Sequence, residues 1–237
     1  MPETVRLAKR LAHMLPCSRR EAELYITGGW VRVDGVPVDE PQYRVGDEQT
    51  VELDPQARAE PQEPVTLLLH QAADSNEAEA ARQMTPETHV ADDPTPRRVL
   101  RSHFARLTAV LPLQEGASGL AVFTQDRRVV RRLGDAERPV EQEYVVEVAG
   151  TIAPDGLELL QHGLQFAGRA LPAIKVSWQS ENRLRFALKN PQPGQLRFMC
   201  GQVGLQVVAM KRIRIGRLPM AELPPGQWRY LGERERF

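Results

Sequence analysis

Residues 111–126, LPLQEGASGLAVFTQD, join a loop of small side chains to a short apolar run, and they decide the fold of the larger part of the chain. Small residues at 116–119 let another segment of chain approach the backbone closely. The apolar run at 120–123 is typical of a buried strand. A loop that feeds a central strand is a common place for a reactive side chain. The stretch therefore predicts a buried strand with a functional loop at its start.

The composition bounds the class of protein. A chain of 237 residues can hold one medium domain and one small domain. Its formal net charge is zero, so a surface for a polyanion must come from local segregation of charge. Two cysteines and five histidines are scattered, without the spacing of a disulfide framework or a metal site. No apolar run reaches the length of a membrane span, and residues 1–10 lack a signal-peptide core. These features predict a cytoplasmic globular protein with no membrane segment and no bound metal.

Charge is segregated in the N-terminal part of the chain. Residues 4–15 predict a helix, Ser18 and Glu21 form a capping-box pattern that starts a second helix, and residues 34–35 predict a hairpin turn. The candidate RNA-binding residues of this region are Arg6, Lys9, Arg10, Arg19, Arg20 and Arg32. A basic helix pair beside an acidic hairpin suits phosphate contacts. On charge alone, an ordinary solvated helix face is the stronger interpretation.

The pattern of residues 18–38, SRREAELYITGGWVRVDGVPV, favours RNA binding over a solvated helix face. It resembles the core of the S4 RNA-binding domain, S-R-R-x-A-x-x-x-I-x-x-G-x-V-x-V-N-G, and the resemblance covers roughly residues 5–54. In that family the basic helix pair grips structured RNA. We therefore expect an S4-like domain at residues 1–54, a proline-rich linker at 55–64 (PQARAEPQEP) and a second domain at 65–237.

The second domain resembles the RsuA-type pseudouridine synthases, which isomerise uridine in ribosomal RNA. Residues 111–126 align without a gap with the family's signature loop, G-R-L-D-x-D-[ST]-x-G-L-L-L-L-T-N-D. The catalytic aspartate of the family falls on Gln114, and its preceding arginine falls on Pro112. The resemblance implies that Tyr144 stacks on the target uracil and that Arg197 pairs with the catalytic carboxylate. Residues 190–216 resemble the family's E-G-K-N-R-Q-I-R-R-M segment and the strand after it, with Gly194 and Phe198 in place of two of its arginines. The candidate RNA-binding residues of this stretch are Gln195 and Arg212.

The same resemblance implies an α+β fold with a mixed, mainly antiparallel central sheet. It also implies a monomer that uses no metal or organic cofactor. The expected partner is RNA, namely ribosomal RNA or a ribosome assembly intermediate. Tyr144 and Arg197 are expected to form the floor of a nucleotide-sized pocket, with Gln114 at its mouth.

The chemistry of uridine isomerisation conflicts with the residue at position 114. The target base is first flipped out of its stack, and a carboxylate then acts as nucleophile or base at the sugar. Gln114 is a neutral amide and cannot do this, although it keeps hydrogen-bonding capacity. Glu115 carries a carboxylate one residue away, but a misplacement of even about 1 Å costs on the order of a hundredfold in rate. Further family positions are lost at Pro112, at the Gln71-Ala72 pair and at Gly194.

Three hypotheses are compatible with this conflict. The first is an RNA-binding protein of the family that has lost or impaired isomerase activity. The second is an active pseudouridine synthase in which Glu115 substitutes for the aspartate. The third is a protein-interaction scaffold that has lost RNA binding as well. Losses that fall together at the expected catalytic site, beside an intact S4 pattern, favour the first.

Other segments are interpreted from their pattern. Strands are predicted at residues 65–70, 141–148 and 183–188, and basic helices at 97–110 and 126–133. The two basic helices suit an RNA channel or, equally, a solvated surface. Residues 73–96 suit a mobile loop or a short helix over 75–84.

Overall fold

The computed structural model describes residues 4–237 and divides the chain into two compact units. The first unit comprises Met1–Pro64 and Pro96–Arg106, and the second comprises Val65–Thr95 and Leu107–Phe237. The first three residues, which belong to the N-terminal domain predicted from the sequence, lie outside the described residues. Each unit has a hydrophobic core built from its own side chains.

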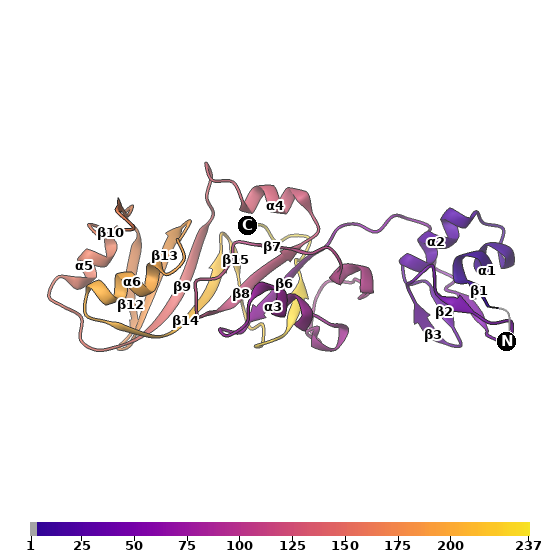
Figure 1. Cartoon of the computed structure of the whole chain (residues 1–237), viewed down its shortest axis with the longest axis horizontal. Helices are drawn as coiled ribbons and strands as arrows, with labels where there is room; N and C mark the ends of the chain where they lie inside the picture. The colour runs from indigo at the N-terminus through magenta and orange to yellow at the C-terminus, as the bar shows by residue number, and fades with distance from the viewer. Residues whose placement is uncertain (1–3) are drawn as a thin grey trace. The chain divides into compact units, whose positions relative to one another are not determined.

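In the first unit, two helices and a small sheet share one hydrophobic core (Figure 1). The strand order in the sheet is β3-β2-β5, and a two-stranded ribbon pairs β1 with β4. The elements in chain order are β1 (Val5–Arg6), α1 (Leu7–Met14), α2 (Arg19–Thr27), β2 (Val31–Val33), β3 (Val36–Val38), β4 (Arg44–Val45) and β5 (Val51–Leu53). This is the S4 architecture that the sequence predicts.

Local signals in the sequence explain these boundaries. The Ser18 hydroxyl accepts from the Glu21 amide at 3.2 Å, and the Glu21 carboxylate accepts from the Ser18 amide at 2.8 Å. This reciprocal pair confirms the predicted capping box at the start of α2. Asp34 and Gly35 both have positive φ, 51° and 78°, as a two-residue hairpin turn between β2 and β3 requires.

Residues 96–106 differ from the prediction. The helix expected over 97–110 is wrong: the segment is extended, with a 3₁₀ turn η2 (Arg101–Phe104), and β7 (Thr108–Val110) follows. Tertiary contacts override the helical pattern here. Arg98 donates to Asp54 at 2.8 Å and stacks 3.9 Å over the Trp30 ring, and Arg101 donates to Glu40 at 2.6 Å. Residues 96–106 therefore pack on the first unit, although the sequence predicts them to be part of the second domain.

The buried ring of His103 should make the free energy of unfolding depend on pH. Burial lowers the pKa of His103 from 6.5 to about 4, and the positive charge of Arg97 adds to the shift. The unfolded chain therefore takes up the proton first, so the stabilising effect of the neutral ring is present above about pH 6.5 and lost as the pH falls through about 4. The greatest loss is about 3 kcal/mol of the free energy of unfolding. NMR titration of the ring, assigned with His103→Gln, should give a pKa near 4. A pKa near 6.5 would contradict this burial.

The second unit is built on one long sheet with the strand order β12-β13-β9-β14-β8-β6-β16 (Figure 1). Its neighbouring strands are antiparallel except for β14 and β8, which are parallel. The sheet is thus mixed and mainly antiparallel, as predicted. The strands of this sheet are β6 (Thr66–Gln71), β7, β8 (Ala117–Thr124), β9 (Glu141–Ala149), β12 (Lys175–Ser180), β13 (Arg183–Lys189), β14 (Gln206–Ile215), β15 (Leu218–Pro219) and β16 (Trp228–Tyr230). A separate two-stranded ribbon pairs β10 (Gln165–Phe166) with β11 (Arg169–Ala170).

The helices of the second unit lie between these strands along the chain. They are α3 (Glu77–Gln83), the 3₁₀ turn η1 (Pro86–Thr88), α4 (Arg127–Leu133), α5 (Gly156–Gln161) and α6 (Gln195–Gln202). Of the two interpretations of residues 73–96, the short helix forms, and Asn76 caps it through a capping box with Glu79. The predicted helix at 126–133 also forms. Asp126 caps it by accepting from the Arg128 amide at 2.8 Å.

Strand β8 occupies the position that residues 111–126 predict. Residues 120–124 of the strand are buried, and β8 pairs with both β6 and β14. Gly119 has φ of 113°, and a Cβ atom at this position would lie 2.3 Å from the Arg212 carbonyl oxygen on β14. The small residue is therefore required by the close parallel pairing of β8 with β14.

Candidate functional site

Gln114 lies in the loop that leads into β8, three residues before the strand, and it is 4% exposed. Its side-chain amide donates to the Gln192 carbonyl oxygen at 2.8 Å and approaches the Pro191 carbonyl oxygen at 3.5 Å. Its own backbone carbonyl accepts from the Ala117 amide at 2.9 Å. The amide of Gln114 therefore ties the loop before β8 to the loop before α6.

Two further hydrogen bonds extend this arrangement into a cluster of three glutamines, Gln114, Gln192 and Gln195. The Gln192 amide donates to the Gln195 side-chain oxygen at 3.0 Å, and the Gln195 amide donates back to the Gln192 carbonyl at 3.0 Å. The Gln192 carbonyl thus accepts two hydrogen bonds, which fills both of its lone pairs. Gln192 is not among the residues predicted from the sequence. The available signal was its position three residues before Gln195 at a helix start.

One atom of the cluster has no partner among the described residues. The side-chain Oε1 of Gln114 is buried and accepts no hydrogen bond from residues 4–237. Gln195 is also buried, at 4% exposure, so its side chain offers little accessible surface to RNA, although it is a candidate RNA-binding residue. Its side chain instead fixes the backbone that precedes α6.

Arg197 and Glu115 lie at the exposed side of this loop. A Cβ atom on Gly116 would lie 3.2 Å from Arg197 Nη2, so the guanidinium passes close to the turn at 115–116. Both Arg197 and Glu115 are exposed. Within residues 4–237 neither side chain forms an ion pair. The expected pairing of Arg197 with position 114 is therefore not made in this structure.

Tyr144 and Arg212 are placed in the interior, and both are 0% exposed. The Tyr144 hydroxyl donates to Gln142 Oε1 at 3.2 Å, and Arg212 Nη1 donates to the same oxygen at 2.8 Å. Arg212 also donates to the Leu120 carbonyl at 2.8 Å and to the Pro112 carbonyl at 3.4 Å. Burial lowers the pKa of the Arg212 guanidinium, and the Tyr144 hydroxyl opposes the shift.

This burial corrects two expectations from the sequence. With no exposed surface, the Tyr144 ring has no face for a base, and Arg212 has no access to a phosphate. Both side chains instead join β8, β9 and β14 through buried hydrogen bonds. Tyr144 packs in the core of the second unit, which is the usual outcome for a tyrosine in a central strand.

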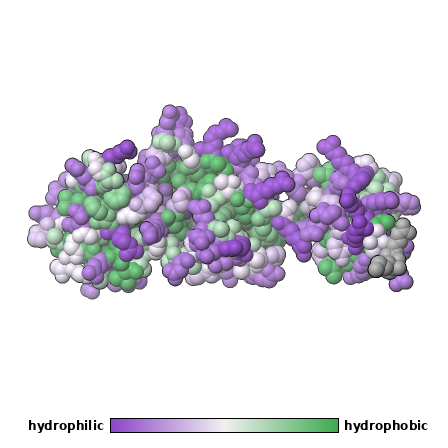
Figure 2. Space-filling model, viewed as in Figure 1, coloured by the Kyte–Doolittle hydropathy of each residue, from purple (hydrophilic) through white to green (hydrophobic). Residues whose placement is uncertain are grey.

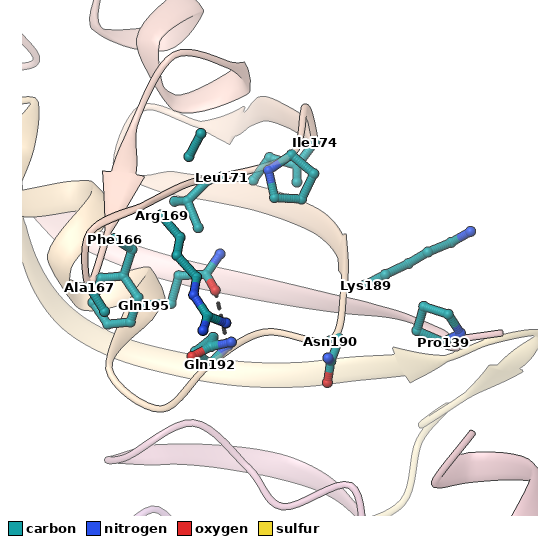
Figure 3. A pocket seen from close by; sticks show the side chains of 12 residues that line it. Pro139, Phe166, Ala167, Arg169, Leu171, Ile174, Lys189, Asn190, Gln192 and Gln195 are labelled. Atoms are coloured by element: carbon teal, nitrogen blue, oxygen red, sulfur yellow. Dashed lines mark hydrogen bonds between the residues drawn. The ribbon is translucent and has the colours of Figure 1, made fainter. Parts of the chain in front are cut away.

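An open pocket of about 670 Å³ lies beside the glutamine cluster (Figure 3). It is lined by Phe166, Arg169, Asn190, Gln192 and Gln195, with apolar residues between them. Figure 3 shows the Arg169 side chain extending toward Gln192 and Gln195. The pocket is therefore lined neither by Gln114 nor by Tyr144 nor by Arg197, although the sequence predicts all three around a nucleotide-sized pocket.

The candidate RNA-binding residues of the first unit lie mostly at the surface. Arg6, Lys9, Arg20 and Arg32 are exposed, and none of them forms an ion pair within the described part of the chain. Arg19 is exposed and pairs with Glu23 at 3.3 Å. Arg10 is half-buried and pairs with Asp47 at 3.2 Å. The first unit thus carries a group of exposed cations on β1, α1, α2 and β2.

Helix α4 adds a second basic surface on the other unit. Its four arginines, Arg127, Arg128, Arg131 and Arg132, are exposed. Hydrophilic side chains cover this helix in Figure 2. Of the two predicted basic helices, only α4 forms, because residues 97–110 contain no α-helix.

Metal centres and membrane spans are the other classes of site to consider. Among residues 4–237, no group of three or more histidine, cysteine, aspartate or glutamate side chains is arranged to hold a metal ion. In the same part of the chain, no helix is long and apolar enough to cross a membrane.

Comparison with known proteins gives the class to which this fold belongs. Residues 5–51 match the S4 domain family. A crystal structure of a pseudouridylate synthase aligns with 96% of this chain and 96% of its own, with a TM-score of 0.59 and 17% sequence identity. The fold is therefore an S4 domain followed by a pseudouridine synthase domain.

Sequence relatives give the family. The chain is 30% identical to ribosomal large subunit pseudouridine synthase B of Escherichia coli O6:H1, over 94% of this chain and 78% of that protein. It is 28% identical to an uncharacterized RNA pseudouridine synthase of Aquifex aeolicus, over 98% of this chain and 94% of that protein. This chain belongs to the ribosomal RNA pseudouridine synthase family that carries an N-terminal S4 domain.

Proposed function

We propose that this protein binds ribosomal RNA or a ribosome assembly intermediate and makes no pseudouridine. One observation carries the proposal. At the position that aligns with the family's catalytic aspartate, Gln114 is buried and donates its amide to the Gln192 carbonyl at 2.8 Å. The amide is thus a structural donor between two loops, and an amide is neither a base nor a nucleophile.

The surroundings of Gln114 also disfavour a carboxylate. A carboxylate at this position would face the carbonyl oxygens of Gln192 and Pro191, and all three groups are acceptors. A buried carboxylate without a donor is destabilised relative to its protonated form. In the family, by contrast, the resemblance implies an ionised aspartate held by an arginine. Here Arg197 is exposed and forms no ion pair with any described residue.

RNA binding is assigned to the exposed cations of the S4 helices. Charge reversal by the double variant Arg19→Glu, Arg20→Glu should weaken binding to ribosomal RNA fragments about tenfold or more. The slope of log Kd against log salt should fall by about 1 for each phosphate that the variant can no longer neutralise. Filter binding at several salt concentrations measures both quantities. Because phosphate contacts carry no base information, the weakening should be similar for RNA of different sequence.

A matched control separates this effect from a change in net charge. The double variant Arg234→Glu, Arg236→Glu alters the formal charge equally at exposed positions near the C-terminal end. It should leave the affinity unchanged. If both double variants bind equally well, or weaken equally, the S4 helices do not carry the binding.

A second candidate function rests on Glu115. Its carboxylate is exposed one residue from Gln114, in the turn that the Arg197 guanidinium approaches. Movement of this turn would bring a carboxylate and an arginine together, as the family's chemistry requires. Release of tritium from RNA labelled at uridine carbon 5 tests the proposal against this alternative. We expect no release above that of a protein-free control, whereas release in proportion to protein would favour Glu115.

A further inference from the structure

Two phenylalanines form an aromatic pair at the surface of the second unit. The ring centroids of Phe166 and Phe198 are 5.2 Å apart, with 58° between the ring planes. Phe166 lies on β10 and is half-buried, whereas Phe198 lies on α6 and is 36% exposed. At position 198 the family pattern has an arginine.

The hairpin of β10 and β11 sets the position of Phe166. Its turn residues, Ala167 and Gly168, both have positive φ, 48° and 76°. This geometry makes a tight two-residue turn and pairs Phe166 directly with Arg169 across the hairpin. Cross-strand partners have neighbouring side chains on one face of the ribbon. The turn thus brings a ring and a guanidinium to the rim of the 670 Å³ pocket.

The charged side chains that line the pocket have one sign. The lining of the pocket includes Arg169 and Lys189 and no carboxylate. Arg197 adds a third cation, since it neighbours Phe198 in α6. None of these three side chains forms an ion pair within residues 4–237. In Figure 2, the surface over β10 and α6 mixes hydrophobic with hydrophilic side chains.

We propose that Phe166 and Phe198 form a stacking platform for an unpaired base of RNA, with Arg169 and Arg197 contacting the phosphates beside it. The proposal rests on the RNA-binding function proposed above and adds a second contact region on the second unit. Aromatic rings interleaved with cations are the general means by which proteins hold single-stranded nucleic acid. The pocket next to the rings has the volume of a small-ligand site, so an unstacked base can enter. A duplex keeps its bases stacked and offers the rings no free base.

The test uses the full chain and a short single-stranded RNA that contains 2-aminopurine, whose fluorescence falls when the base stacks. Phe198→Leu keeps an apolar side chain and removes the ring, so it should weaken binding about 5- to 100-fold and restore the fluorescence. Phe198→Tyr keeps the ring and should bind as wild type does. Trp178→Leu removes an exposed ring on β12 that belongs neither to the aromatic pair nor to the lining of the pocket, and it should also bind as wild type does.

The outcomes separate this proposal from the one on which it rests. If Phe198→Leu binds and quenches as wild type does, while Arg19→Glu, Arg20→Glu loses affinity, the platform is wrong and RNA binding stands. Equal weakening by Trp178→Leu would also overturn the platform. If wild type binds neither the single strand nor ribosomal RNA fragments, the proposed function itself fails. Arg169→Ala is a second variant at an exposed position, and it should reduce both the affinity and its salt dependence.

Discussion

Replacement of Arg212 by alanine should lower the free energy of unfolding of the second unit by about 3–5 kcal/mol. The guanidinium is fully buried and donates to three acceptors: the Leu120 carbonyl, the Pro112 carbonyl and Gln142 Oε1. Alanine leaves both carbonyls without this donor and leaves a cavity between β8 and β14. Each buried acceptor that loses its partner costs about 1–3 kcal/mol, and removal of the buried charge offsets part of that sum. Urea unfolding measures the change.

The controls for this prediction use the same chemistry at other positions. Arg217→Ala deletes an exposed arginine two residues beyond β14 and should change stability by less than about 0.5 kcal/mol. Arg212→Met fills part of the cavity and should cost less than alanine does. If Arg212→Ala is as stable as Arg217→Ala, the guanidinium is not a structural element, and its assignment to RNA contact would return.

Replacement of Gln114 by glutamate should destabilise the second unit by about 3 kcal/mol at neutral pH. The two side chains have the same shape, so the variant removes the donor and adds a charge without changing the packing. In wild type the amide donates to the Gln192 carbonyl, whereas a glutamate there faces that carbonyl with an acceptor. The absence of one buried hydrogen bond and the burial of a charge without a donor both contribute.

The pH dependence of the same variant gives a second readout. Burial without a donor raises the folded-state pKa of a carboxyl above its unfolded value. The folded state then binds the proton first as the pH falls, so the deficit against wild type should shrink between neutral pH and about pH 5. Gln202→Glu makes the same change at an exposed position of α6 and should show neither effect. A Gln114→Glu variant as stable as wild type at neutral pH would contradict the structural role of the amide.

Much of the fold follows from local signals in the sequence. The capping box at Ser18, the turn at residues 34–35 and the apolar run at 120–123 each determine their own element through short-range chemistry. Such signals depend on neighbouring residues, so they can be identified without knowledge of the tertiary contacts. The apolar run at residues 120–123 also predicts a central strand with a loop before it, and Gln114 lies in that loop, three residues before β8.

The contacts between distant segments could not be predicted in this way. Residues 97–110 have an apolar period that suits a helix, yet Arg98 and Arg101 bind acidic residues of the first unit, and the segment forms no α-helix. Likewise, nothing near Tyr144 in the sequence indicates that it interacts with Arg212, which lies 68 positions further along and pairs with it across β9 and β14. The partner of Gln114 lies 78 residues away. Propensity and periodicity do not report such pairs, because tertiary packing decides them.

The central claim, that position 114 carries a structural amide in a protein that makes no pseudouridine, is tested most directly by counting the product. Unmodified ribosomal RNA is incubated with wild type, with Gln114→Asp and with Glu115→Gln, and pseudouridine is measured by mass spectrometry of the digested RNA. We expect none above background from all three proteins. Gln114→Asp should stay inactive because Pro112 and Gly194 stand where the family pattern has basic groups, and because Arg197 forms no ion pair within residues 4–237. Product from wild type that disappears in Glu115→Gln would contradict the claim and assign the reaction to Glu115, and product that survives in Glu115→Gln would contradict the placement of the catalytic position at 114.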